Sequence, residues 1–253
     1  MTLAYTTHGR GPEPVLVLHD WMGDSGNYDT VRPWLDGAAF TYAFADLRGY
    51  GASREIAGAY SVAEIAADVL ALADALGWAR FHVVGHSMTG MVTQRLAADA
   101  PARIRSAVAV CPVSAAGNRL DAATKAFFAS TTTDDAAFAR LIGFVSSGLS
   151  PAWAEAKLAQ NRRCVAPAVA LRYLDMLTGA DFADEVRGAA TPFLVAIGGR
   201  DPGLDEAAMR RTFLDWHPNA ELAVVAGSGH YPMQECPPAF AGLIEAFLRR
   251  HAD

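Results

Sequence analysis

Short apolar runs alternate with helical patterns along most of the chain, and this alternation limits the possible folds more than any other sequence feature. The runs occupy residues 15–18, 40–45, 81–84, 104–110, 193–197 and 222–225. Because each run is apolar nearly throughout, it is typical of a strand covered on both faces of a parallel sheet. Between two runs, residues 61–76 place Ile65, Val69 and Leu72 on one helical face. The pattern predicts an α/β fold with a mostly parallel central sheet flanked by helices.

The helix predicted over residues 61–76 carries signals at both ends. Ser61 and Glu64 have the spacing of a capping box, in which each side chain accepts a backbone N–H at the start of the helix. Gly77 stands where a left-handed residue commonly ends a helix. We therefore expect this helix to begin and end within a residue or two of these positions.

The alternation stops between residues 113 and 190, a segment that we call the insert. It contains no convincing strand pattern, but Asp134, Pro151 and Pro167 mark helix starts. A segment of this length is too long for a simple connection, although ordinary crossover helices must account for part of it. We expect residues 1–112 and 191–253 to form one α/β core. The insert, residues 113–190, is expected to form a helical cap that precedes the strand carrying Asp201.

Composition and charge exclude several classes of protein. Hydrophobic residues make up 52% of the 253 residues and charged residues only 19%, the opposite of a disordered chain. The net charge of −6 argues against nucleic acid or an anionic membrane surface as a partner. No signal peptide or membrane-length apolar stretch is visible, and the three scattered cysteines fit a reducing compartment better than a zinc site. We expect a cytoplasmic monomer or homodimer that acts on a small molecule, with no metal.

A sharp turn between a strand and a helix is predicted around Ser87. Residues 81–90 read FHVVGHSMTG, an apolar run followed by the start of a helical pattern. A serine at such a bend stands exposed at the carboxyl edge of the sheet, with the N-terminus of the helix directed at it. Gly85 provides a small residue two positions before Ser87, whereas Thr89 occupies the position two after it. The alternative is that Ser87 only caps the helix.

Two later strands end in residues that could activate Ser87. The run FLVAIGGRD ends at Asp201, and the run LAVVAGSGH ends at His230. An activated serine needs a base within hydrogen-bond reach and a carboxylate that orients the base. The carboxyl ends of parallel strands meet at one edge of a sheet, which would bring the three residues together. We expect Ser87 to be the nucleophile, His230 the general base and then acid, and Asp201 the residue that orients His230. Asp205, a nearby rival, fits the start of the next helix better.

In combination these motifs resemble the α/β-hydrolase superfamily over nearly the whole chain outside the insert. Besides the serine turn, the chain carries HDW at residues 19–21, DLRGYGAS at 46–53 and GHYPMQECP at 229–237, in the order that the family has. Asp20 and Thr89 stand where the family usually has glycine. The resemblance implies similarity to esterases, enol-lactonases and cofactor-free haloperoxidase-like serine hydrolases. It also implies an oxyanion hole formed by the backbone N–H groups of Trp21 and Met88.

Aromatic residues of the insert are expected to contribute to an apolar substrate cleft, although most of them should pack the insert onto the sheet. The candidate substrate-binding residues are Asp20, Trp21, Phe128, Phe144, Trp153 and Tyr173.

The leading functional hypothesis is a cofactor-free serine hydrolase that cleaves a carboxylic ester or lactone of a small, largely apolar substrate through an acyl-enzyme on Ser87. Carbon–carbon bond hydrolysis and perhydrolase or haloperoxidase chemistry use the same three residues and are alternatives. A small-molecule receptor or a lyase on the same fold is an alternative of another class. A nicotinamide cofactor is not expected, because no G-x-G-x-x-G motif follows the first apolar run.

Overall fold

The computed structural model describes residues 2–252, and seven strands of this part of the chain form one sheet in the order β1-β3-β2-β4-β5-β6-β7. The strands are β1 (Tyr5–His8), β2 (Glu13–Leu18), β3 (Phe40–Ala45), β4 (Phe81–His86), β5 (Ile104–Val110), β6 (Phe193–Gly198) and β7 (Ala220–Val225). Strands β2 to β7 run parallel, and β1 pairs antiparallel with β3. The predicted mostly parallel α/β fold is confirmed. Strand β1 was not predicted, because its sequence, YTTH, is polar and largely exposed.

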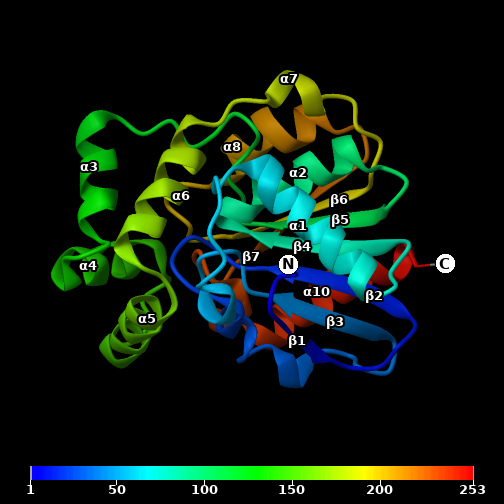
Figure 1. Ribbon diagram of the computed structural model, residues 1–253, viewed down its shortest axis with the longest axis horizontal. Helices are drawn as coiled ribbons and strands as arrows, with labels where there is room; N and C mark the ends of the chain where they lie inside the picture. The colour runs from blue at the N-terminus through cyan, green and yellow to red at the C-terminus, as the bar shows by residue number, and fades with distance from the viewer. Residues whose placement is uncertain (1, 253) are drawn as a thin grey trace.

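Helices cover both faces of the sheet, with α1 and α2 in front of it and α10 behind it in the view of Figure 1. The helices are α1 (Val62–Ala75), α2 (Gly90–Asp99), α3 (Ala122–Ser130), α4 (Asp135–Val145), α5 (Pro151–Cys164), α6 (Pro167–Gly179), α7 (Ala183–Val186), α8 (Glu206–Met209), α9 (Pro232–Glu235) and α10 (Pro237–Arg250). Short helical turns are η1 (Ser25–Tyr28), η2 (Arg32–Trp34), η3 (Gly51–Ser53), η4 (Ser87–Thr89) and η5 (Arg210–Leu214). No helix within residues 2–252 has both the length and the apolar character needed to cross a membrane.

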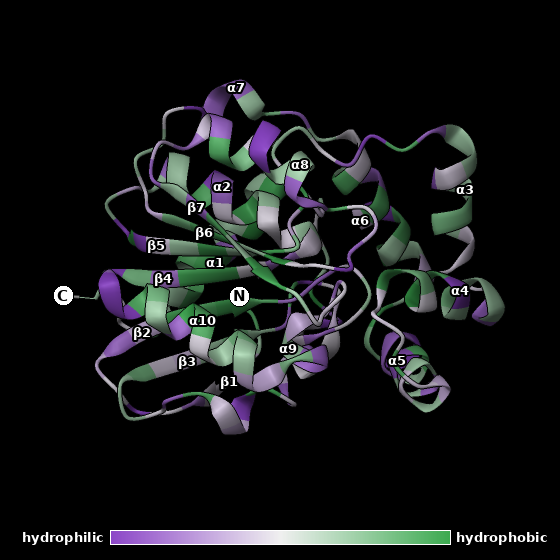
Figure 2. Cartoon of the chain, turned by 180° about the vertical axis from the view of Figure 1, so that it is seen from behind, coloured by the Kyte–Doolittle hydropathy of each residue, from purple (hydrophilic) through white to green (hydrophobic). Residues whose placement is uncertain are grey.

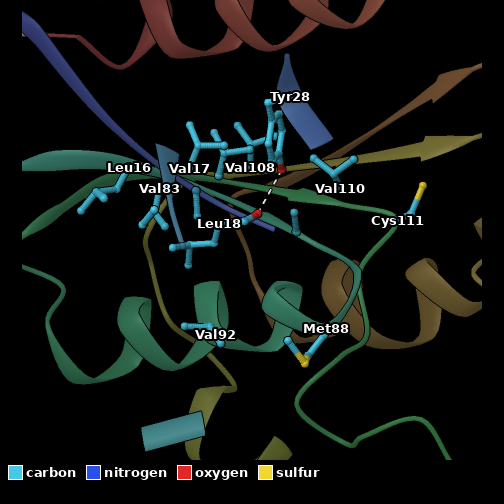
Figure 3. Close-up of a cluster of buried hydrophobic side chains, with 14 of the residues drawn as sticks. Leu16, Val17, Leu18, Tyr28, Val83, Met88, Val92, Val108, Val110 and Cys111 are labelled. Carbon is cyan, nitrogen blue, oxygen red and sulfur yellow. Dashed lines mark hydrogen bonds between the residues drawn. The ribbon is translucent and has the colours of Figure 1, made fainter. Parts of the chain in front are cut away.

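The core lies around the central strands β2, β4 and β5, which are buried on both faces. Figure 3 shows Tyr28 of η1 on one side of these strands and Val92 of α2 on the other. The Tyr28 hydroxyl donates to the carbonyl oxygen of Leu18 at 3.0 Å, so that the buried phenol has a partner. The central strands are predominantly hydrophobic (Figure 2), as the apolar runs predict. This rigid centre supports the carboxyl edge, where β2 and β4 end.

The boundaries of α1 confirm the predicted end signals, with one difference. The Ser61 side chain accepts the Glu64 N–H at 3.2 Å, and Gly77 follows the helix with a φ of 73°. The Glu64 carboxylate, however, accepts the N–H groups of Tyr60 (2.7 Å) and Ala59 (3.2 Å) and not that of Ser61. Tyr60 has a φ of 57°, and this turn brings both N–H groups to Glu64.

The insert contains five helices and no strand of the sheet. Helices α3, α4 and α5 lie to one side of the core in Figure 1, whereas α7 lies near α2. Val186 of α7 packs with Ala115 and Trp216 in a small separate cluster against the core. We propose that α3 to α6 act as the cap, which is shorter than the predicted residues 113–190 because α7 returns to the core.

Candidate active site

Ser87 occupies a strained turn between β4 and α2. Its φ is 54°, in the left-handed region that residues other than glycine rarely adopt. Holding a serine in this conformation costs about 1–3 kcal/mol. The turn needs glycine two residues earlier, since a Cβ on Gly85 would lie 2.4 Å from the carbonyl oxygen of Thr89. At a sharp turn of this kind the serine side chain stands out from the end of the strand. Ser87 accordingly lines a cavity.

Thr89 fits the turn although glycine is usual at its position. Its Oγ1 accepts the backbone N–H of His86 at 2.8 Å and lies 3.0 Å from the carbonyl oxygens of both His19 and His86. A hydroxyl has one proton, so it donates to one of these carbonyls at a time. The side chain thus joins the serine turn to the loop after β2, residues 19–24, which we call the β2 loop.

Asp201 and His230 form a buried hydrogen-bonded pair at the carboxyl ends of β6 and β7. Asp201 Oδ2 lies 2.6 Å from His230 Nδ1, and Asp201 Oδ1 accepts the N–H groups of Gly203 (3.0 Å) and Leu204 (3.1 Å). Burial would raise the pKa of Asp201, but the His230 charge, its hydrogen bond and the two N–H groups lower that pKa to about 2. The carboxylate therefore stays ionised at neutral pH. Asp205 caps α8 by accepting the Ala208 N–H at 2.8 Å, as predicted.

His230 is held from several directions. Its backbone N–H donates to the carbonyl oxygen of Val145, at the end of α4 (2.9 Å), and its carbonyl oxygen lies 2.7 Å from His86 Nε2. Burial opposes protonation of His230, yet the Asp201 carboxylate, its hydrogen bond and the Asp20 charge raise the pKa of His230 above its ordinary value. A raised pKa makes the neutral imidazole a stronger proton acceptor.

Ser87, Asp201 and His230 all line one cavity, so the structure brings the three predicted residues together. Among the hydrogen bonds of residues 2–252, none joins Ser87 Oγ to His230. In unliganded active sites such bonds are often longer than in the complex with substrate.

Cys111 lies beside the Asp201–His230 pair. The sulfur and the nearest ligand atoms of Asp201 and His230 all lie within 4.8 Å of one another, a spacing that a metal ion could use. Burial raises the pKa of the Cys111 thiol well above its ordinary value, which disfavours the thiolate that a metal would need. Asp201 and His230 already satisfy each other. The donor set therefore suits a hydrogen-bonded cluster better than a metal centre.

The β2 loop is fixed next to Ser87 by hydrogen bonds from several elements. His19 Nε2 accepts the Leu47 N–H at 3.1 Å, so its Nδ1 carries the proton and donates to the Asp20 carbonyl oxygen at 2.7 Å. The Trp21 carbonyl oxygen accepts the Tyr50 hydroxyl at 2.8 Å. The N–H groups of Trp21 and of Met88, the residue after Ser87, donate to no protein acceptor within the described chain. Both are available to a ligand.

The Asp20 side chain is buried and fully partnered. Its Oδ1 accepts Asn27 Nδ2 at 2.7 Å, and its Oδ2 accepts the Tyr231 hydroxyl at 2.8 Å. Burial opposes ionisation of Asp20, but the charge of Lys157 and the hydrogen bond from Tyr231 hold the pKa of the carboxyl well below its ordinary value. Asp20 therefore places a fixed negative charge beside His230.

The cavity has a volume of about 330 Å³ and is mainly apolar. Four of the six predicted substrate-binding residues line it, namely Asp20, Trp21, Phe128 and Phe144. The rings of Trp21 and Phe128 stack with their centroids 6.0 Å apart, and Phe144 is 66% exposed. Further apolar lining comes from Met22, Val113, Leu120, Phe127, Leu141, Val145, Leu177 and Leu204.

Trp153 and Tyr173 lie outside the cavity, which corrects their predicted role as substrate-binding residues. Trp153 Nε1 donates to Gln234 Oε1 at 3.1 Å, and its ring packs on the edge of Tyr231. The Tyr173 hydroxyl donates to the Arg48 carbonyl oxygen at 2.9 Å. Both residues attach the insert to the core, and the apolar spacing of a helix does not distinguish this role from lining a cleft.

The roles of two residues near the site, Glu235 and Lys157, were not predicted from the sequence. Glu235 accepts the N–H groups of Ser147 (2.8 Å), Gly229 (2.9 Å) and Tyr231 (2.9 Å), and so braces the loop that carries His230. Its place in the GHYPMQECP motif was a usable signal. Lys157 of α5 is buried behind the site with 2% of its surface exposed. Nothing in its sequence context separates it from a solvated lysine.

Comparison with known proteins shows similarity to hydrolases of the same fold and to an acetyltransferase component. A dihydrolipoyllysine-residue acetyltransferase component of an acetoin cleaving system from Cupriavidus necator is 29% identical over 251 residues, with 96% of this chain and 66% of that protein covered. This chain thus spans just under two thirds of that relative. A pimeloyl-acyl-carrier-protein methyl ester esterase from Yersinia enterocolitica is 28% identical over 257 residues, with 96% and 95% covered. The enol-lactonase from Burkholderia xenovorans has the same fold, with a TM-score of 0.86, 23% identity and 98% and 96% covered.

The family model of the alpha/beta hydrolase fold matches residues 13–235, which include the serine turn, Asp201 and His230. The chain belongs to the alpha/beta hydrolase fold family, as its motifs indicated.

Proposed function

We propose that this protein is a serine hydrolase that cleaves carboxylic esters or lactones with a neutral, largely apolar acyl group. The observation that carries the proposal is the Asp201–His230 hydrogen bond of 2.6 Å on the wall of a cavity that Ser87 also lines at a φ of 54°. A structural serine needs neither the strained turn nor a neighbouring histidine whose pKa is raised.

The proposed reaction begins when Ser87 Oγ attacks the carbonyl carbon of the substrate and passes its proton to His230 Nε2. Asp201 stabilises the imidazolium through Nδ1. The negative charge on the former carbonyl oxygen is stabilised by the free N–H groups of Trp21 and Met88, each of which is worth about 3–4 kcal/mol in comparable sites. The C–O bond then breaks, and His230 returns its proton to the departing alkoxide. Water repeats the sequence on the acyl-enzyme and releases the acid and Ser87.

The lining of the cavity supports an uncharged substrate. Within the described chain, no lysine or arginine lines the cavity, whereas Asp20 and Asp201 are among its lining residues. A substrate carboxylate would lose its hydration and meet two negative charges there. Two further polar residues, Asn118 and Thr124, line the cavity away from Ser87 and His230. Their side chains can bind a carbonyl or hydroxyl group of the substrate.

Turnover of short-chain aryl esters by the wild type and by Ser87→Ala tests the proposal. We expect the wild type to release a burst of the phenol from the aryl ester. A fluorophosphonate should inactivate the wild type by attaching one label per chain, at Ser87. The substitution should lower kcat by about 10⁴-fold or more and abolish labelling. Equal activity of the two proteins would refute the proposal. A wild type that binds a ligand without turning it over would instead point to a receptor.

A further inference from the structure

The insert docks on the β2 loop through a polar face of α5. Lys157, Gln160 and Asn161 are three and four residues apart and therefore lie on one side of this helix. Gln160 Nε2 donates to Asp24 Oδ1 at 2.7 Å, and Asn161 Nδ2 donates to the Met22 carbonyl oxygen at 3.1 Å. Figure 2 shows hydrophilic segments along α5, in contrast to the central strands. The contact between insert and loop is thus specified by directional bonds.

Lys157 is the charged centre of this contact. Its Nζ donates to Asn27 Oδ1 at 2.5 Å and to Gln160 Oε1 at 3.2 Å, and it lies 4.7 Å from the centre of the Tyr231 ring. Two hydrogen bonds and one cation–π contact thus stabilise the ammonium group. Burial lowers the pKa of Lys157, so an opposite charge nearby is what favours its protonated form.

That opposite charge is Asp20, which the Asn27 amide connects to Lys157. Asn27 accepts Lys157 through Oδ1 and donates to Asp20 through Nδ2 at 2.7 Å, so the amide passes the interaction from cation to anion. Gly23 leaves room for it, since a Cβ there would lie 2.2 Å from Asn27 Oδ1 and 2.7 Å from Lys157 Nζ. The aspartate that replaces glycine beside Trp21 therefore has a partner in the insert.

We propose that Lys157 is a positioning residue, which holds Asp20 through Asn27 and thereby sets the Trp21 N–H of the β2 loop for catalysis. The inference rests on the proposed function. According to this inference, the active site is complete only when α5 is docked on the β2 loop. If the insert moved away, Lys157 would no longer compensate the charge of Asp20. Asp20 would then be a buried carboxylate without a cation.

The same charges act on His230 in opposite directions. The groups that face His230 or its immediate neighbours are Asp201, Asp20, Glu235, His86, Tyr231, Cys111 and Lys157. The Asp20 carboxylate raises the pKa of His230, and a cation that neutralises Asp20 lowers it. Substitutions at the two charges should therefore move the acid limb of the kcat/KM profile in opposite directions, which a purely structural role would not do.

The test is a double-mutant cycle of Asp20→Asn and Lys157→Met, measured by kcat, KM, pH profile and melting temperature. We expect Lys157→Met to lower kcat about ten- to a hundredfold with KM changed much less, because a misplaced N–H affects the transition state most. Its acid limb should shift to higher pH, and that of Asp20→Asn to lower pH. The double variant should recover most of the kcat and melting temperature, since no unpaired charge remains.

Lys125→Met is the matched control, because Lys125 is the other lysine of the chain and pairs with Asp175 on the surface of the insert. It should leave kcat and the pH profile unchanged. Lys157→Met with a kcat within about twofold of the wild type, or single effects that simply multiply in the double variant, would overturn the inference.

If Lys157→Met alone does not fold, the double variant is compared with Asp20→Asn. A similar kcat supports the charge pair, and a tenfold lower kcat in the double variant contradicts it. The coupling in melting temperature needs no turnover. Failure of the proposed function, seen as a wild type without ester turnover or phosphonate labelling, is therefore distinguishable from failure of this inference.

Discussion

The Thr89 hydroxyl illustrates how one buried polar atom can hold two loops. It is the acceptor for the buried His86 N–H and a donor toward the β2 loop. We expect Thr89→Val, which keeps the shape but removes the oxygen, to lower the free energy of unfolding by about 1–3 kcal/mol, because the N–H loses its partner. Urea unfolding of the two proteins measures the difference.

Thr93→Val is the control for this prediction. The Thr93 hydroxyl is also buried, but it only donates to the Gly90 carbonyl oxygen, and its loss leaves no N–H without an acceptor. Thr93→Val should therefore lower the free energy of unfolding by less than Thr89→Val does. A Thr89→Val protein as stable as the wild type would show that the hydroxyl is not needed at the serine turn.

His86 should make stability depend on pH. Burial lowers the pKa of His86 to about 3 in the folded protein, whereas in the unfolded chain it protonates near 6.5. Between these values the unfolded state binds the extra proton, so the free energy of unfolding falls as the pH falls, by up to about 1.4 kcal/mol per pH unit. His217, with its pKa lowered to about 4, adds to the same trend.

We expect His86→Gln, which keeps a donor for the His230 carbonyl, to flatten this dependence below about pH 6.5 and to leave it unchanged above. Urea unfolding at several pH values tests this. Parallel stability curves for the two proteins would contradict a neutral buried His86.

At the scale of elements, the loop that carries His230 depends on Glu235. Its two oxygens accept three N–H groups, one of them from Ser147 in the insert. We expect Glu235→Gln to cost about 1–3 kcal/mol of stability, because an amide has one oxygen and leaves at least one N–H unpaired. The acid limb of the kcat/KM profile should move to lower pH, since the Glu235 charge raises the pKa of His230.

Glu221→Gln serves as the comparison. Glu221 pairs with Arg250 on the surface, where an ion pair contributes little, so stability should change by about 0.5 kcal/mol or less. Equal losses in both variants, or an unmoved acid limb in Glu235→Gln, would speak against the bracing role.

The elements themselves were largely predictable, because burial on both faces leaves a continuous apolar run. Strands β3 (Phe40–Ala45) and β5 (Ile104–Val110) have the predicted bounds, and helices begin at Pro151, at Pro167 and directly after Asp134, as expected. Strand β1 lies at an edge with polar side chains and gives no such signal.

Side chains between elements were predictable only where chemistry fixes their type. Ser87, Asp201 and His230 could be identified because the proposed reaction requires these residue types. Asp20 could be identified because it stands where the family usually has glycine. Lys157 acquires its meaning from a contact with Asn27, 130 residues away, and no local pattern encodes that distance. Trp153 shows the converse, since an aromatic residue on a helix can face either a cavity or a neighbouring element.

At the scale of the whole molecule, charge should govern the choice of substrate. The chain carries a net charge of −6, and the carboxylates of the two aspartates that line the cavity, Asp20 and Asp201, are ionised at neutral pH. We expect a half-ester of a dicarboxylic acid to have a kcat/KM about tenfold or more below that of the matching neutral diester. Added salt should narrow the gap only in part, because exposed charges are screened and buried ones much less.

Steady-state rates with the two esters at low and high ionic strength provide the measurement. The half-ester should regain some rate in salt while the diester stays unchanged. A higher kcat/KM for the half-ester would mean that a cation contacts the bound substrate. It would refute the proposal that the substrate is neutral.

The backbone at position 87 also limits how this protein can evolve. Threonine differs from serine by one methyl group and offers the same hydroxyl, but a β-branched residue is poorly tolerated at a φ of 54°. Cysteine is unbranched at Cβ and fits the bend. A lineage that starts from this chain can therefore exchange an oxygen nucleophile for sulfur more readily than it can add a methyl group, because the bend selects by shape before it selects by reactivity.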